Sequence, residues 1–423
     1  MIQKIKNKIF KSKDYKTLLT NFLSLSTLQA LDLFLPLITF PYLIRVLGVD
    51  NFGLVAFAQS FILYFNVFVD FGFNYSATRR ISVNRLNTKK VSEIFSSVIQ
   101  IKLIFLFISF LILHLIICSF EKFSSDSELY YLTFMYVIGH SLIPTWFFQG
   151  LEEMKFLTYI NIIAKGIFTV LIFLLIKESS MYMFVPLING IGLIIAAIFS
   201  LFLVFSKYKI EFKFSNFRLL LFYVKDSFDF FLSRLSVSIF NSSNIFVLGL
   251  FNNNLIVGYF SIAQKIYNAL KSLFTPVSRT LYPYISYKKN IQFFKKIFYF
   301  LTTFNFIIVC FFWFFAPNVI KLISGESLLI STSIFRILII YSIFTVPCSL
   351  LGYAFLAAVG YKNFANYSVV IASILHILGV VILSSFNLVT IYNITYLIAF
   401  SESIVLIIRV YGIRKHNLWS KKF

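Results

Sequence analysis

Long apolar runs, recurring from Leu18 to Val410, constrain this chain more than any other feature. About 18 apolar residues suffice to cross a bilayer as a helix, the form in which a lipid-exposed backbone satisfies its own hydrogen bonds. Only 13% of the residues are charged, against about a quarter in soluble domains. The fold class is therefore an all-α polytopic membrane protein. We predict about twelve transmembrane helices, at residues 18–43, 54–72, 97–118, 129–149, 158–176, 183–205, 229–250, 258–278, 297–315, 329–356, 366–384 and 390–410.

Basic residues are distributed unevenly among the links between these ranges. They gather before the first range, after the second, sixth and eighth, and in the C-terminal tail, while the alternate links hold few. Lysine and arginine accumulate in cytoplasmic loops, so we expect both termini in the cytoplasm. The same rule accounts for the net charge of +22 without nucleic acid as a partner. The first run is too long for a signal peptide and no small-residue cleavage site ends it, so we expect an uncleaved first helix.

A short internal repeat divides the chain. Gly53-Leu-Val-Ala-Phe-Ala58-Gln59 opens the second predicted helix and Gly258-Tyr-Phe-Ser-Ile-Ala263-Gln264 opens the eighth, and both read G-x-x-x-x-A-Q. Three matches can also be coincidence, but Pro144 and Pro347 share roughly the same offset. Repeated halves are a known transporter plan. We predict a six-helix bundle over 1–205, a cytoplasmic linker over 206–228, a second six-helix bundle with a basic tail over 229–423, and a transport path between the bundles.

Polar side chains follow single faces of the first two predicted helices of each half. Residues three, four or seven apart share a helix face, and one-sided polarity on equivalent helices favours a water-filled lumen. Ordinary hydrogen bonding between helices explains such residues equally well. The residues that we predict to be polar or gating groups of the lumen are Asp32, Gln59, Asp70, Asn241, Gln264 and Asn268.

Cations inside apolar ranges are harder to explain by packing. A charge near the membrane centre costs about 2.5–3.5 kcal/mol on insertion scales and is usually functional. The alternative is that the side chain extends to the membrane surface, which fits Arg234 best. Fixed cations with few acids suit an anion, because lysine and arginine are natural phosphate partners. We predict substrate contacts for Arg234, Lys265, Lys165 and Arg336.

The sequence shows no catalytic motif. It has no P-loop, no H-E-x-x-H and no cluster of cysteine or histidine, so we expect a transporter rather than an enzyme, with no metal and no cofactor. ATP hydrolysis by this chain is not expected. Coupling to a proton or sodium gradient, or removal of the product, would supply the driving force.

One stretch carries a family resemblance. The run Pro41-Tyr-Leu, Arg45-Val-Leu-Gly48, Phe52-Gly53, Ala56-Phe-Ala-Gln59 and Asp70-Phe-Gly72-Phe-Asn resembles Wzx-type flippases. These are bacterial polysaccharide exporters of the MOP (multidrug, oligosaccharidyl-lipid, polysaccharide) superfamily. Further matches follow at Ala77-Thr-Arg-Arg-Ile-Ser, Asn84-Arg85, Phe147-Phe-Gln-Gly-Leu-Glu152, Pro276-Val and Tyr282-Pro283.

The resemblance implies two six-helix bundles of the MOP/MATE type in the bacterial inner membrane. Its cargo would be an undecaprenyl-diphosphate-linked oligosaccharide repeat unit for O-antigen or capsule, moved by alternating access. A polysaccharide polymerase, a chain-length regulator and membrane lipids are the expected partners. No family motif covers Arg234 or Lys265, so their assignment rests on their chemistry alone.

Other functions remain open from the sequence. A MATE-like drug exporter would need buried carboxylates on its path, and Asp32, Asp70 and Glu402 are the candidates. A lipid II flippase shares the same plan. A membrane polysaccharide polymerase is less expected, because no large outer loop is present. We also predict structural hinges at Pro36, Pro41, Gly53 and Gly72, where proline and glycine let helices bend and approach closely.

Overall fold

The structure is a computed structural model that describes residues 13–419. Side chains are described for residues 34–419 except those at positions 37, 236, 237, 239–241 and 279. Every regular element in the described range is a helix. The first elements are α2 (Lys13–Asp70), α3 (Phe73–Asn84), α4 (Thr88–Ser119), α5 (Glu121–Ser124), α6 (Ser127–Leu142), α7 (Thr145–Gly150), α8 (Met154–Leu175), η1 (Ser179–Met183), α9 (Phe184–Tyr208) and α10 (Phe217–Phe251). The remaining elements are α11 (Asn254–Ser272), α12 (Thr275–Lys288), α13 (Ile291–Phe314), α14 (Ala316–Ser324), α15 (Leu329–Leu351), η2 (Gly352–Ala357), α16 (Lys362–Ser385) and α17 (Ile391–Lys415).

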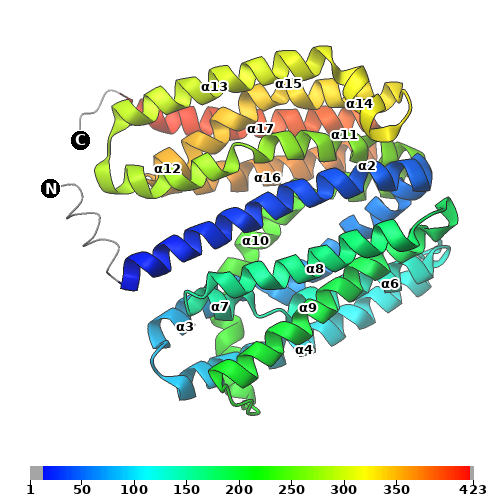
Figure 1. Ribbon diagram of the computed structural model, residues 1–423. Helices are drawn as coiled ribbons and strands as arrows, with labels where there is room; N and C mark the ends of the chain where they lie inside the picture. Colours follow the sequence, from blue (N-terminus) through cyan, green and yellow to red (C-terminus); the bar gives the residue numbers. More distant parts are fainter. Residues whose placement is uncertain (1–12, 420–423) are drawn as a thin grey trace. The chain divides into compact units, whose positions relative to one another are not determined.

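The helices form two compact units. Among the described residues, unit 1 takes in 13–40 and 58–235, and unit 2 takes in 41–57 and 236–419. Figure 1 shows α4, α6, α8 and α9 running alongside one another in unit 1, and α11, α13, α15, α16 and α17 doing so in unit 2. The division of the chain into bundles at 1–205 and 229–423 remains a prediction.

Each of the twelve predicted ranges lies mainly on helical residues, and the range 129–149 is interrupted at Ile143 and Pro144. Within the described residues, eight helical segments are long and apolar enough to cross a membrane. The two numbers differ in part because the segment Phe34–Asn84 counts once although it covers two predicted ranges. In addition, α6 has only 16 residues, and α11 carries Lys265 and Lys271. The chain is a multi-pass membrane protein, and the count of twelve crossings and the side of the termini remain predictions.

Glycines interrupt the first long helix after the first and after the second predicted span. Gly48 has φ +75° and ψ 167°, which interrupts α2 between the first two predicted spans. Gly72 has φ +77° and separates α2 from α3. A Cβ on Gly72 would also lie 2.7 Å from the Cβ of Phe230 in α10. Both positions therefore need glycine, for the left-handed backbone that other residues adopt only at a cost.

The two copies of the repeat pack against each other inside unit 2. A Cβ built on Gly53 would lie 2.6 Å from the backbone nitrogen of Gly258, and it would also collide with the carbonyl oxygen of Asn254. A Cβ on Gly258 would collide in turn with the carbonyl oxygen of Val49. The repeated glycines thus let α2 and α11 approach backbone to backbone, the contact that small residues permit between membrane helices.

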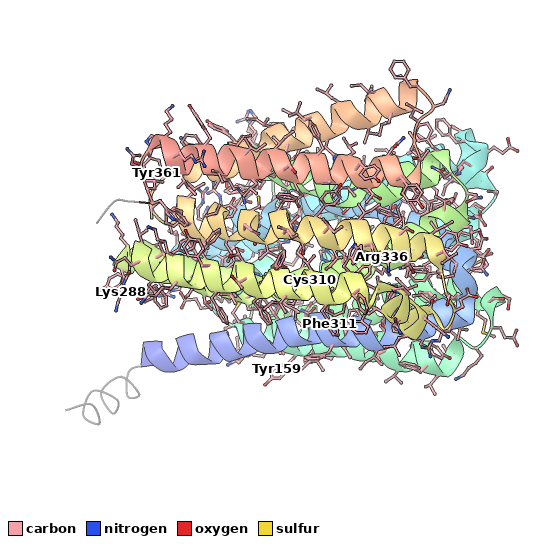
Figure 2. The ribbon with its side chains drawn as sticks, turned by 90° about the horizontal axis from the view of Figure 1, so that it is seen from above. Tyr159, Lys288, Cys310, Phe311, Arg336 and Tyr361 are labelled. Atoms are coloured by element: carbon pink, nitrogen blue, oxygen red, sulfur yellow. The ribbon has the colours of Figure 1, made fainter. Side chains whose placement is uncertain are left out.

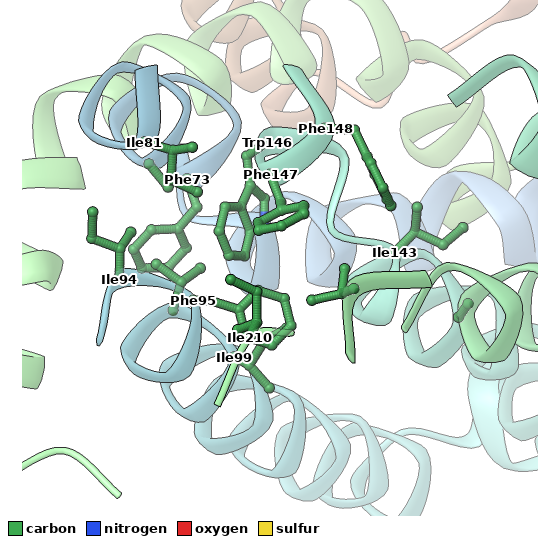
Figure 3. Packing of buried hydrophobic residues seen from close by; sticks show 14 of the residues in the cluster. Phe73, Ile81, Ile94, Phe95, Ile99, Ile143, Trp146, Phe147, Phe148 and Ile210 are labelled. Atoms are coloured by element: carbon green, nitrogen blue, oxygen red, sulfur yellow. The ribbon is translucent and has the colours of Figure 1, made fainter. Parts of the chain in front are cut away.

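The core of unit 1 lies around the short helix α7. Pro144 precedes this helix, and Ile143 before it is extended, so the predicted fourth span is broken there. The side chains of Trp146, Phe147 and Phe148 are fully buried. Figure 3 shows Trp146 and Phe147 near Phe95 of α4 and Phe73 of α3, with Phe148 toward Ile143. This aromatic core fixes α3, which carries a pair of arginines, against α4 and α7.

The link between α9 and α10 is an extended segment, residues 209–216, held along α4. Ser92, Ser96 and Gln100 share one face of α4 at spacings of four. Their side chains bond the backbone of the segment: Ser92 at Glu211, Ser96 at Glu211 and Lys213, and Gln100 at Lys213 and Ser215. These side chains replace the strand partner that an extended backbone otherwise needs.

In unit 2 the long helices have two distinct ends. Figure 2 shows Lys288, at the end of α12, and Tyr361, just before α16, at one end, with Arg336 toward the other. At the first end α15 passes into η2, a π-helical turn that begins at Gly352. Such turns are rare and often occur at functional sites.

Candidate functional site

The four predicted cations take separate aromatic or polar surroundings. In unit 1 the Arg234 guanidinium lies 6.0 Å from the ring centre of Tyr75, and Lys165 is half-buried on α8. In unit 2 the Lys265 ammonium lies 4.8 Å from the ring centre of Phe52. Arg336 lies over Trp313 at 5.0 Å and donates from Nε to the carbonyl oxygen of the same residue at 3.2 Å. Within unit 2, Lys265 and Arg336 therefore face different helices.

The predicted neutral groups differ in their exposure. Gln59 lines a small cavity of about 180 Å³ in unit 1, together with Thr133, Tyr136 and Asn189. Gln264 is half-buried and Asn268 is exposed. The side chains of Asp32 and Asn241 lie outside the described part of the chain. Gln59 is therefore a predicted lumen residue that borders internal space within unit 1.

The predicted hinge residues occupy several environments. Pro36 is exposed on α2, and Pro41 is half-buried where α2 passes from unit 1 to unit 2. Gly53 lies at the close contact with α11, and Gly72 lies at the junction of α2 and α3. Their role as hinges remains a prediction.

Asp70 belongs to a buried charge pair that the sequence analysis did not predict. Lys102 of α4 donates from Nζ to the Asp70 carboxylate at 3.2 Å and to the Ser141 carbonyl at 3.4 Å. Asn74 donates to both carboxylate oxygens at 2.9 Å. The side chains of Lys102 and Asp70 are only 2% and 9% exposed. The pair neutralises itself in the interior of unit 1. Lys102 lies inside the predicted range 97–118 and could have been recognised there as an intramembrane cation.

A second polar cluster lies inside unit 2. Lys271 of α11 pairs with Glu402 of α17 at 3.1 Å. About two turns farther along α17, Arg409 is 6% exposed and contacts two other helices. Arg409 stands within the last residues of the range 390–410, and its position in an apolar run was the available signal for it.

Arg409 bonds neutral acceptors. Its Nε donates to Ser368 Oγ at 3.0 Å, and its Nη1 donates to the Cys348 carbonyl at 2.6 Å. Its Nη2 donates to the Ala365 carbonyl at 3.3 Å. No carboxylate of the described residues lies within ion-pair distance of it. The cluster of Lys271, Glu402 and Arg409 therefore carries one uncompensated positive charge.

A cavity of about 490 Å³ borders this cluster. Lys271, Arg409 and five hydroxyl side chains line it: Thr275, Ser278, Tyr282, Ser349 and Tyr353. Two cations and several hydroxyl groups favour an anion over a cation in this cavity. This cavity, together with Arg234 and Lys265, makes up the candidate functional groups of the chain.

His376 connects three helices of unit 2. It is 1% exposed, and its Nδ1 and Nε2 lie 3.0 Å from Ser401 Oγ and 3.1 Å from Asn244 Oδ1. These partners belong to α17 and α10. The described residues contain no group of three or more histidine, cysteine or acidic side chains that could hold a metal.

Comparisons with known proteins agree on family and fold. The sequence model of the family described as "Polysaccharide biosynthesis protein" matches residues 18–289. Two curated proteins named "Putative O-antigen transporter" are similar in sequence. The one from Escherichia coli (strain K12) is 31% identical over 63% of this chain and 64% of its own length, so the match spans less than two thirds of that relative. The one from Shigella dysenteriae is 28% identical over 66% of this chain and 69% of its own length.

Solved structures share the fold. The lipid II flippase MurJ, in an inward closed conformation, superposes with a TM-score of 0.70 at 17% identity, covering 94% of this chain and 87% of that one. An inward-facing multidrug resistance MATE transporter of the MOP superfamily superposes with a TM-score of 0.67 at 16% identity, covering 92% and 96%. At these identities the likeness concerns the fold. It confirms the MOP/MATE-like architecture that the sequence predicts.

Proposed function

Because the chain belongs to the polysaccharide biosynthesis protein family, we propose that it is a flippase for a lipid-linked oligosaccharide. Its cargo is an undecaprenyl-diphosphate-linked repeat unit of an O-antigen or capsule, moved across the bacterial inner membrane by alternating access. The observation that carries the proposal is the family match over residues 18–289, joined to a fold shared with a flippase of another lipid-linked saccharide.

The chemistry of the intramembrane residues supports this cargo. A diphosphate needs fixed positive charge, and Arg234, Lys265 and Arg336 supply cations inside helices. Each of these three stands within about 6 Å of an aromatic ring. Aromatic faces are also suited to the apolar faces of sugars, so a cation beside a ring can contact both parts of a glycan diphosphate. We propose that these side chains bind the head group while the isoprenoid tail remains in the lipid.

A deletion strain tests the function. Loss of the gene is expected to abolish the surface glycan and to leave lipid-linked oligosaccharide on the inner leaflet, and the wild-type gene on a plasmid is expected to restore display. A single repeat unit left on the surface would indicate a polymerase. Sensitivity to cationic dyes with normal glycan would indicate a drug exporter, and an essential gene would indicate a lipid II flippase.

We propose a proton or sodium gradient as the driving force. Proteoliposomes that contain the purified protein and a lipid-linked oligosaccharide test it, with lectin access reporting the outer leaflet. An ionophore that collapses the gradient of the coupling ion is expected to slow translocation of the oligosaccharide. An ionophore that collapses the gradient of the other ion is expected to leave the translocation rate unchanged.

A further inference from the structure

The cavity beside Lys271 and Arg409 has no part in the proposal above, and its charge is unusual for its place. Arg409 is buried in an apolar helix, where a charged side chain is costly and usually functional. A buried arginine ordinarily lies next to a carboxylate. Glu402 is the nearby acid, and Lys271 already neutralises it. The positive charge of Arg409 can therefore interact with a negatively charged ligand that enters the cavity.

The backbone around Arg409 makes room for the guanidinium. A Cβ on Gly352 would lie 2.7 Å from the Arg409 Cζ, so any larger residue would displace the group. Gly352 is also the first residue of the π-helical turn η2. The backbone contacts of Arg409, at Cys348 and Ala365, then fix the orientation of its planar group. A guanidinium held in this way is preorganised for a ligand.

Apart from Arg409 and Lys271, the residues that line the cavity carry hydroxyl groups and no negative charge. Thr275, Ser278 and Tyr282 come from α12, and Ser349 and Tyr353 come from α15 and η2. Lys271 of α11 adds an ammonium group, which also pairs with Glu402 at 3.1 Å. No carboxylate is among the lining residues. Tyr353 donates to Asn366 Oδ1 at 3.0 Å and Ser349 donates to the Val346 carbonyl at 2.9 Å. A tetrahedral oxyanion has the oxygens to accept from Lys271, Arg409 and the hydroxyls of α12.

We propose that this cavity is a binding site for a phosphate or diphosphate group, contacted by Lys271, Arg409 and the hydroxyls of α12. Its volume of about 490 Å³ holds a diphosphate with part of an attached group. The diphosphate of an isoprenoid-linked cargo and the headgroup of an anionic phospholipid share this chemistry. The cavity is lined by α12 and η2. Figure 2 shows Lys288, at the end of α12, and Tyr361, which follows η2, at one end of unit 2. We expect this end to face the cytoplasm, because basic residues gather in cytoplasmic loops.

The decisive experiment adds a competing carboxylate without removing Arg409, whose contacts with α15 and α16 also support the fold. Ser278→Asp places an anion on the cavity wall, and Ser278→Asn is the neutral control of matched shape. The full-length protein, purified without phosphate, is titrated with inorganic pyrophosphate, and binding is followed by calorimetry and by the unfolding temperature. Saturable binding is expected for the wild type and for Ser278→Asn, and Ser278→Asp is expected to weaken it about tenfold or more.

Lys271→Gln gives a second, independent reading. It removes the ammonium and leaves Glu402 unpaired next to the cavity, so pyrophosphate affinity is expected to fall by a similar factor. Arg414→Gln, on α17 but outside the cavity lining, also removes one positive charge and is expected to leave the pyrophosphate affinity unchanged. Absence of saturable binding to the wild type would overturn the proposal. Equal affinity of the wild type and Ser278→Asp would overturn it as well.

Nanodiscs distinguish the two natural sources of the phosphate. In phosphatidylcholine discs the pyrophosphate affinity is expected to match that in detergent. If added phosphatidylglycerol competes and Ser278→Asp abolishes the competition, the occupant is a phospholipid headgroup. If pyrophosphate binding is unaffected by that lipid and farnesyl diphosphate displaces it, the occupant is an isoprenoid diphosphate. These measurements use purified protein, so they test the binding site independently of the flippase function, which the glycan phenotype of the deletion strain tests.

Discussion

Gly53 and Gly258, the first residues of the two G-x-x-x-x-A-Q copies, lie against each other at the crossing of α2 and α11. A methyl group on Gly53 would lie 2.6 Å from the nitrogen of Gly258, and one on Gly258 would collide with the carbonyl of Val49. A repeat found as a weak pattern in the sequence thus becomes a contact between its own copies in unit 2. No space remains for a methyl group at either glycine, so substitution by alanine tests the contact.

Alanine at either glycine is expected to lower the free energy of unfolding by about 1–3 kcal/mol, the cost of overpacking a tight contact. Fluorescence-detected thermal unfolding in detergent measures the change. Gly166→Ala in α8 is the control, because a Cβ there meets nothing within 4 Å. That variant is expected to gain about 0.5–1 kcal/mol from the better helix former. Unfolding temperatures of Gly53→Ala and Gly258→Ala at or above the wild type would contradict the contact.

The buried pair of Asp70 and Lys102 is expected to behave as a unit. Removing one partner leaves a charge in the interior of unit 1, so Asp70→Asn or Lys102→Met alone is expected to cost about 3–5 kcal/mol. The double variant Asp70→Asn/Lys102→Met is expected to recover most of that loss. A double-mutant cycle on the unfolding temperature measures the coupling, and losses that simply add would show that the two side chains do not interact.

Asp226 is expected to make the folding stability of the protein depend on pH. Its carboxylate accepts from Arg80 Nε at 2.8 Å and from Arg79 Nη2 at 3.0 Å. The Arg80 hydrogen bond lowers the pKa of Asp226 below its ordinary 3.8, partial burial opposes this, and the charges of Arg80 and Arg79 add to the lowering. A lowered pKa in the folded state stabilises the protein above the unfolded-state pKa, and the benefit is lost as pH falls through the folded-state pKa.

The difference in unfolding temperature between the wild type and Asp226→Asn is therefore expected to be constant above about pH 5 and to vanish on acidification below about pH 4. Asp229→Asn, three residues along α10, is the control, since Asp229 makes no ion pair with any described residue. A wild-type advantage that grows on acidification would show that the sign is wrong.

The predicted cargo contacts are tested together. Arg234→Gln/Lys265→Gln is expected to abolish glycan display in the complemented deletion strain while membrane insertion and expression stay normal, because both fixed cations are lost. Arg85→Gln/Lys155→Gln is the matched control. It removes one arginine and one lysine from exposed ion pairs with Glu152 and Glu153, which are worth little. Normal display by the first variant would remove Arg234 and Lys265 from the binding site.

The extended segment 209–216 depends on Gln100. Gln100→Leu removes two hydrogen bonds, to Lys213 and Ser215, of about 0.5–1.5 kcal/mol each. Trypsin is expected to cleave after Lys209 or Lys213 roughly tenfold faster, in proportion to the opened population. Limited proteolysis measures the rate, and Gln292→Leu, exposed on α13 of unit 2, is the control. An unchanged cleavage rate would mean that the segment is held by other contacts.

Much of the architecture was predictable because hydrophobic length alone defines a membrane helix. Every predicted range lies mainly on helical residues, and Gly48 breaks α2 in the predicted link. The partners of the charges were not predictable. Asp70 was interpreted as a lumen group, yet it binds Lys102, 32 residues away, because the rotation of α4 against α2 brings them together. Rotation depends on packing across helices, which a pattern along one helix does not contain.

The assignment of Arg234, Lys265, Lys165 and Arg336 to the substrate site remains a prediction. The signal behind it, a cation inside an apolar range, would also have singled out Lys102 and Arg409, which the structure places in polar clusters. It could not have distinguished a neutralised lysine from an uncompensated arginine. That distinction depends on whether a carboxylate lies near, and only the fold shows that Glu402 is taken by Lys271.

The Asp70–Lys102 pair also bears on how the chain enters the membrane during synthesis. The ribosome releases Asp70 before Lys102, so the first hairpin emerges with an acid that has no counterion. Leaving that acid alone in lipid costs about 2.5–3.5 kcal/mol on insertion scales. The end of α2 is therefore expected to wait at the protein-conducting channel until α4 arrives, and the two helices then enter the bilayer as one neutral unit. Biogenesis of this protein would proceed in pairs of helices, and a chain truncated between residues 70 and 102 would be recognised as unfinished.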